Sequence, residues 1–128
     1  MTYRYSVAVR NAALDAKETT IGATAVLKIF SGAEPANCAA ADPSGLLVTI
    51  TLPSDWMNAA SAGAKTKLGT WSGTASGTGT AASWRLYASD GTTCHVQGSM
   101  SDMVLDNNSI SVSQVVTVNT FSITSGNA

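Results

Sequence analysis

The stretch Thr80–Met100 reads TAASWRLYASDGTTCHVQGSM and contains two arms in which apolar and polar side chains alternate. Alternation with a period of two is typical of strands that bury one face. The Asp-Gly pair at 90–91 between the arms favours a tight turn, because Gly accepts positive φ and Asp tolerates it. The stretch therefore predicts a long antiparallel hairpin at the centre of a β-sandwich. Its core-facing side chains are expected to be Trp84, Leu86, Val96 and Met100, with Cys94 on the same face.

The composition predicts one folded domain with a surface that carries few charges. The chain has 128 residues, of which 45% are hydrophobic and only 12% are charged. That charged share is about half of the usual value. Ser and Thr together supply a quarter of the residues, and they suit strands and turns. A charge-poor surface is weakly protected against association, so we expect contact with a partner.

Charge and hydropathy argue against two classes of partner. Seven basic and eight acidic side chains give a net charge of −1, and they form no basic cluster that could neutralise phosphates. We therefore expect no binding to nucleic acid. Nor does any apolar run approach the roughly 20 residues that a membrane-spanning helix needs, so we expect no membrane contact. The first residues, MTYRYS, lack the apolar segment of a signal peptide, which predicts synthesis in a cytoplasm.

The order of the remaining patterns predicts one helix followed by strands. Residues 3–18 combine a narrow apolar stripe with several Ala residues and predict the helix. Residues 23–31 and 45–53 predict two strands, the first covered by the helix on one side, the second with Leu46 facing inward. Residues 65–71 predict a weaker strand, and residues 71–80 fit either a linker or a Gly-weakened strand. Closing strands are expected at 109–113 and 115–124, with a bulge between Val118 and Phe121.

Together these elements predict a mainly β fold. We expect a single domain over residues 1–128, with the helix at about 3–18 and a β core at about 23–124. The absence of βαβ alternation favours an antiparallel β-sandwich, jelly-roll-like, with one N-terminal helix.

The sequence carries no recognisable catalytic or metal-binding pattern. His95 is the single histidine, and local spacing places no carboxylate beside it to orient it as a base. Cys38, Cys94 and His95 are a poor zinc set, because adjacent strand residues point to opposite faces. The eight carboxylates are scattered. We therefore expect no enzyme activity, no catalytic residues, no cofactor and no metal, and we interpret the two cysteines as free thiols, with a disulfide as the alternative.

Large exposed apolar side chains are the candidates for a partner interface, since aromatic residues dominate binding hot spots. For Trp56, Trp71 and Tyr87, packing within the fold is an equally good interpretation. The connection at 54–64 is expected to fold over one edge or to meet a partner. The candidate interface residues are Tyr3, Tyr5, Trp56, Met57, Trp71 and Tyr87.

Several segments, spread along nearly the whole chain, resemble a family of small virion structural proteins of tailed bacteriophages. The resemblance lies in the composition and the residue pattern of these segments, and it includes no catalytic signature. Two parts depart from it, namely Cys94–Val96 and the connection at 54–70. The matching segments are Val9–Ala16, Leu27–Pro35, Gly45–Val48, Gly73–Ala75, Ala82–Leu86, Asp90–Gly91, Asn108–Ile110, Val116–Val118 and Phe121–Thr124.

The resemblance implies a structural role in the virion. The first expectation is a capsid decoration, or cement, protein that binds the major capsid protein on the shell surface. A homo-oligomer, either a dimer or a trimer, is expected as well. The second expectation is a minor tail or neck protein, and a small carbohydrate-binding or hydrolase domain is a remote third.

Overall fold

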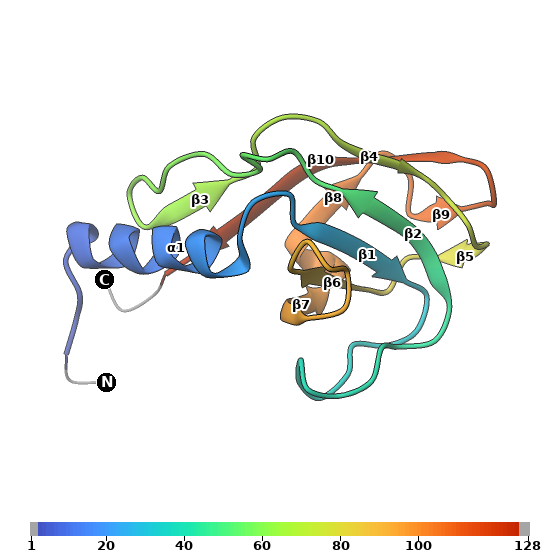
Figure 1. The fold of residues 1–128 in the computed structure, drawn as a ribbon, viewed down its shortest axis with the longest axis horizontal. Coiled ribbons are helices and arrows are strands. Elements are labelled where there is room, and N and C mark those ends of the chain that lie inside the picture. Colours follow the sequence, from blue (N-terminus) through green and yellow to red (C-terminus); the bar gives the residue numbers. More distant parts are fainter. Residues whose placement is uncertain (1–2, 126–128) are drawn as a thin grey trace.

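The chain forms one α-helix followed by ten short strands and a 3-10 turn, as the computed structural model shows for residues 3–125 (Figure 1). The sequence of these elements confirms the predicted mainly β class with one N-terminal helix. Their bounds are α1 Val7–Ile21, β1 Val26–Phe30, β2 Leu46–Thr51, β3 Ala64–Thr66, β4 Trp71–Thr74, β5 Gly79–Thr80, β6 Ser83–Tyr87, β7 Cys94–Ser99, η1 Met100–Asp102, β8 Met103–Leu105, β9 Ser109–Ile110 and β10 Val115–Thr124.

The strands build three antiparallel sheets. One four-stranded sheet has the order β2-β1-β6-β7, and a second has the order β3-β10-β4, with β8 also paired to β10. A small third sheet joins β5 and β9. Buried side chains from the two larger sheets form a single apolar cluster between them. This packing of two sheets around a shared core is sandwich-like.

The predicted hairpin is present and lies at one side of its sheet. Strands β6 and β7 pair with Trp84 opposite Gly98 and Leu86 opposite Val96, and β7 forms the sheet edge. Trp84 and Leu86 are buried, while Val96 and Met100 pack against the core from partly buried positions. A Cβ at residue 98 would lie 2.7 Å from the Trp84 ring, so only Gly fits beneath the indole.

Two register shifts reverse the faces predicted for individual residues. Between Leu86 and Tyr87 the pairing skips one residue of β7, so Cys94 pairs with Tyr87 and lies on the outer face. The prediction that Cys94 faces the core with Val96 is therefore wrong. The shift between Ile29 and Phe30 has the same effect on β2, where Leu47 is buried and Leu46 is exposed. A bulge adds one residue to a strand, so the side chains before it and after it no longer follow one continuous alternation between the two faces.

The segment 32–44 covers the outer face of the first sheet, a role that the sequence assigned to the helix. Every residue of β6 is buried, including Arg85 and Tyr87 on the outer face. Carbonyl groups of Asn37 and Ala40 accept hydrogen bonds from Arg85, which places this segment directly over β6. The helix contacts β3 instead.

Helix α1 begins later than the predicted residue 3 because Ser6 is its N-cap. The Ser6 hydroxyl accepts a hydrogen bond from the Val9 amide at 3.2 Å, which satisfies a donor that the first turn leaves free. The helix ends at Ile21 and is capped by Gly22, whose φ of 94° lies in a region that L-residues rarely adopt. The amide of Gly22 donates to the Glu18 carbonyl. Only Leu14 and Ile21 of the helix are buried.

Candidate partner interface

Four of the six predicted interface residues are buried. Trp56, Trp71 and Tyr87 therefore follow the alternative of packing within the fold, and Met57 packs in the core with the two tryptophans. Trp56 is 1% exposed, Met57 2%, Trp71 0% and Tyr87 1%. Trp56 and Trp71 pack 6.1 Å apart between ring centroids, and Phe121 joins them at 5.5 Å from Trp71. The two indole N–H groups donate to the carbonyls of Gly22 and Leu68, respectively. Buried aromatic rings with satisfied N–H groups are core residues.

The other two predicted residues, Tyr3 and Tyr5, are exposed and lie together. They are 55% and 42% exposed, respectively, and their rings meet edge-to-face with centroids 5.5 Å apart. Val7 and Val9, in the first turn of α1, are 51% and 50% exposed. We call these four residues the arm surface. The sequence missed both valines, because a valine at the start of a helix is usually interpreted as part of the buried stripe.

Polar contacts fasten α1 to the sandwich and leave the arm surface uncovered. The Lys65 ammonium group of β3 is 2% exposed and lies 2.7 Å from Asp15 and 2.8 Å from Glu18. The Gly63 amide donates to the Asn11 side chain at 2.9 Å, and Arg10 donates to the Ser125 carbonyl at 2.8 Å. These contacts all lie on one side of the helix. Figure 1 shows the helix extending past the end of the sheets.

The charges at this contact alter each other's titration. The hydrogen bond from Lys65, followed by that from the Ala60 amide, lowers the pKa of Asp15. Burial alone would lower the pKa of Lys65, but its hydrogen bonds to Asp15 and Glu18 outweigh burial and raise it. Both groups are therefore held in their charged forms at neutral pH.

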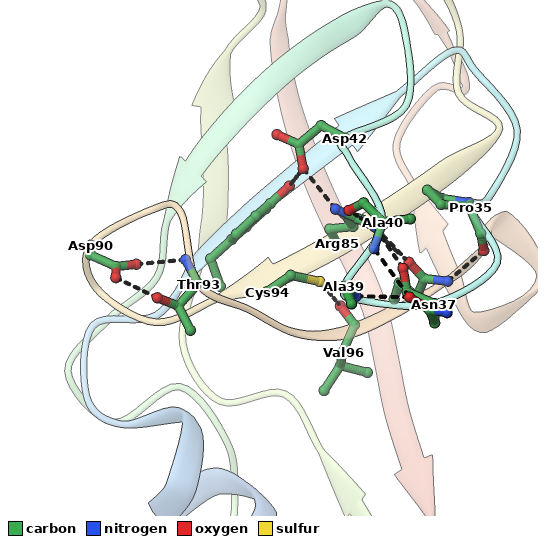
Figure 2. Close-up of polar contacts among 12 residues, drawn as sticks. Pro35, Asn37, Ala39, Ala40, Asp42, Arg85, Asp90, Thr93, Cys94 and Val96 are labelled. Atoms are coloured by element: carbon green, nitrogen blue, oxygen red, sulfur yellow. Dashed lines mark hydrogen bonds and ion pairs between the residues drawn. The ribbon is translucent and has the colours of Figure 1, made fainter.

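A buried polar cluster on the outer face of the first sheet holds the segment 32–44 in place (Figure 2). Its centre is Arg85, which is 2% exposed. The guanidinium group donates to Asp42 at 2.9 Å, to the side chain of Gln97, and to the carbonyls of Asn37 and Ala40 at 3.0 Å each. Each of its three nitrogens has an acceptor.

Tyr87 and Asp42 complete this cluster. The Tyr87 hydroxyl donates to the same Asp42 oxygen that Arg85 contacts. Burial and then the hydrogen bond to Asp42 raise the pKa of Tyr87 well above its usual range. Burial would raise the pKa of Asp42, but the hydrogen bonds from Tyr87 and Arg85 outweigh it and lower it. Among residues 3–125 no buried side-chain N or O atom lacks a hydrogen-bond partner, so the cluster is saturated and positions a segment of chain.

The residues with catalytic potential are not brought together. His95 is exposed on the edge strand β7, where it lines a cavity of about 230 Å³ beside Lys17, Ile21 and Val96. A wider groove of about 650 Å³ crosses β10 and is lined by parts of the segments 66–69, 101–104 and 119–122. The Lys67 ammonium group at this groove is engaged by the Gly69 carbonyl at 2.8 Å. No group of three potential metal ligands occurs within the described part of the chain.

Comparisons of the chain with family models, with curated proteins and with solved structures give no match. Between residues 3 and 125, no helix has the length and apolar character required to cross a membrane.

Proposed function

We propose that this protein is a non-enzymatic structural protein of a tailed-phage virion, and that it decorates the capsid by binding the major capsid protein. The observation that carries the proposal is the arm surface, where four apolar side chains within seven residues are half exposed. The rings of Tyr3 and Tyr5 are in contact at this surface, and exposed apolar groups that lie together are typical of protein-binding sites. The sequence resemblance to virion structural proteins supplies the identity of the partner.

The geometry of α1 supports binding through this arm surface. Because Asn11, Asp15 and Glu18 hold the helix through polar contacts, its exposed apolar start is free to meet another chain. A standard interface buries about 800 Å² on each partner. The two tyrosines at the centre of such an interface would supply its anchors. Repetition over a symmetric shell would multiply many modest contacts.

The proposal places the protein on the capsid surface after synthesis in the bacterial cytoplasm. It includes a dimer or trimer of the chain as the bound form. Neither nucleic acid nor membrane takes part in it, in keeping with the net charge of −1 and the dispersed basic residues.

The first test is the copy number of this protein relative to the major capsid protein in purified particles, measured by quantitative mass spectrometry. A copy number comparable with that of the shell protein is the expected result. A few copies per particle would reject the decoration role and assign the protein to the tail or neck. Its complete absence from particles would reject a virion role.

The second test replaces the arm tyrosines. The double variant Tyr3→Ser and Tyr5→Ser should bind purified shells more than tenfold more weakly, because loss of two aromatic anchors costs roughly 2 kcal/mol or more. Val104→Ser is the matched control, since Val104 is equally exposed at 55% but lies on β8. Unchanged binding by the tyrosine variant, with an unchanged unfolding midpoint, would remove the arm surface from the interface.

A further inference from the structure

The two cysteines of the chain meet on the outer face of the first sheet, although they are 56 positions apart in sequence. Cys94 reaches this face because of the register shift that pairs it with Tyr87. Cys38 reaches it because the segment 32–44 lies over β6 and β7. Cys38 is close enough to contribute to the raised pKa of the Cys94 thiol. In Figure 2 the Cys94 sulfur points toward the turn at residues 37–40.

Hydrogen bonds on both sides of Cys38 fix its position. The side chain of Asn37 accepts from the amides of Ala39 at 2.9 Å and Ala40 at 3.1 Å, which closes a tight turn around Cys38. Arg85 binds the carbonyls of Asn37 and Ala40, the residues before and two after the cysteine. Gln97 of β7 donates to the Pro35 carbonyl at 2.6 Å. The turn is therefore attached to the same two strands that present Cys94.

Cys94 is held with similar firmness. The residue before it, Thr93, donates to Asp90 from its amide at 2.9 Å and from its hydroxyl at 2.6 Å. Its own sulfur lies 3.6 Å from the Val96 carbonyl oxygen. Both thiols are partly exposed and are free, so a small oxidant can reach them. Two cysteines held side by side on fixed backbone segments can be joined without a large movement of the chain.

We propose that Cys38 and Cys94 form an intrachain disulfide when the protein meets a small-molecule disulfide, and that this bond fastens the segment 32–44 to β7. The inference rests on the placement of both cysteines on this face by the register of β7 and by the anchored turn, and it does not require the proposed function. Thiols stay reduced in a cytoplasm and oxidise outside it. The bond would therefore form after the protein leaves the compartment in which it is made.

The reaction is two successive thiol–disulfide exchanges. The Cys38 thiolate attacks one sulfur of the small disulfide, forms a mixed disulfide and releases one small thiolate. Cys94 then loses its proton to solvent and attacks the Cys38 sulfur, which releases the second small thiolate. The two cysteines together lose two protons and two electrons, and the small disulfide is reduced to two thiols.

The order of attack follows from the surroundings of Cys94. Burial, and then the neighbouring Cys38 thiol, raise the pKa of Cys94 to about 12. Little Cys94 thiolate exists at neutral pH, so Cys38 is the first nucleophile. The closing step should become faster as the pH rises.

The test is incubation of the reduced, purified chain with oxidised glutathione, followed by intact mass measurement. The expected product is a monomer that has lost two hydrogen atoms and no longer reacts with iodoacetamide. Trypsin digestion should yield one linked pair, the peptide 29–65 joined to the peptide that begins at Leu86. The variants Cys38→Ser and Cys94→Ser, which keep one thiol each, are the matched controls and should not form this pair. Stable glutathione adducts on the wild-type chain, a disulfide-linked dimer or two thiols that stay reactive would each overturn the proposal.

A second measurement tests whether the bond fastens the segment. Oxidation should raise the thermal unfolding midpoint by several degrees, because the link closes a long loop in the unfolded chain. Reduction should reverse the rise, and Cys94→Ser should show none. A lower midpoint after oxidation would mean that the bond strains the fold, which would reject its fastening role.

Discussion

Arg85 shows how one buried charge can organise a whole segment of chain. It occupies the outer side of a strand whose opposite side is core, and the alternating pattern of β6 gives no sign that this side is covered. Four acceptor groups from the segment 32–44 and from β7 surround its guanidinium group. A buried cation is tolerated only when it is paired and hydrogen-bonded. The segment 32–44 is therefore ordered by the charge that it covers.

Replacement of Arg85 by Met should destabilise the fold and release this segment. Loss of one partner from a buried pair costs about 3–5 kcal/mol. We expect the lower end, about 3 kcal/mol, because Asp42 remains 46% exposed. Urea denaturation measures the cost, and limited proteolysis should show new cleavage within 32–44. The matched control is Arg4→Met, at an exposed position of the N-terminal arm. Equal, small effects of the two variants would contradict the assigned role of Arg85.

Trp56 is a core residue, so its replacement should affect folding before it affects any partner. It is 1% exposed and its indole N–H donates to the Gly22 carbonyl at 3.0 Å. Trp56→Ala should cost about 3–5 kcal/mol of unfolding free energy, as large-to-small core substitutions do. Chemical denaturation monitored by circular dichroism measures this cost. A stable Trp56→Ala variant that loses partner binding would contradict the core assignment.

At the scale of elements, α1 depends on its ends and on a few polar contacts, since only two of its side chains are buried. Ser6→Ala should remove the N-cap hydrogen bond and cost about 1 kcal/mol. The cost should appear as faster amide exchange in the first turn. Ser6→Asp keeps an acceptor at the cap and should restore slow exchange. If Ser6→Ala left exchange in this turn unchanged, the cap would have no stabilising role.

The contact between α1 and β3 should depend on pH because it consists of charged groups. The pKa of Asp15 is lowered in the folded chain, first by its hydrogen bond from Lys65. A carboxyl group with a lowered pKa contributes stability above its unfolded pKa of about 3.9, and that stability is lost as the pH falls below it. The wild type should therefore exceed Asp15→Asn in stability at pH 7, and the difference should shrink below about pH 4. Urea midpoints of both proteins across this range measure the effect, and a constant difference would contradict it.

At the scale of the whole molecule, stability should be highest where burial is greatest. Strands β1 and β6 are adjacent in the middle of the first sheet, and nearly all of their residues are buried. Local opening requires little energy where few apolar contacts are lost. Amide hydrogen exchange should therefore be slowest in β1 and β6 and fastest near the start of α1. Comparable protection in both regions would show that α1 is held more firmly than its contacts indicate.

The sequence was sufficient to predict the class, the helix and the central hairpin. These features depend on local signals, namely alternation, a turn pair and helix-forming residues, and such signals act within a few positions of each other. The approximate strand positions at 26–30, 46–51 and 115–124 follow from the same signals. The pairing partners of these strands were not predictable in this way, because most of the pairs join distant parts of the chain.

The faces of individual residues were harder to predict than the strands. A single extra residue in β7 moves Cys94 outward, and one in β2 exposes Leu46, yet neither bulge has a distinctive local pattern. The burial of the aromatic residues was hard to predict for a related reason. Trp56 lies in a connection and Trp71 begins the short strand β4, and both segments are weakly patterned, so only their three-dimensional packing brings the two rings into the core. Tyr3 and Tyr5 are exposed because the helix begins only after the Ser6 cap, so both residues precede it.

The hydrogen bond from Arg10 to Ser125 places the last described residue beside helix α1, which begins a few residues after the first described one. Chain entry and exit therefore lie at one end of the molecule, whereas the connection between β9 and β10 lies at the other (Figure 1). A second protein fused at either end of this chain would therefore lie close to the arm surface and crowd it. A peptide inserted at residues 111–114 would instead project from the opposite pole and leave the helical end unobstructed.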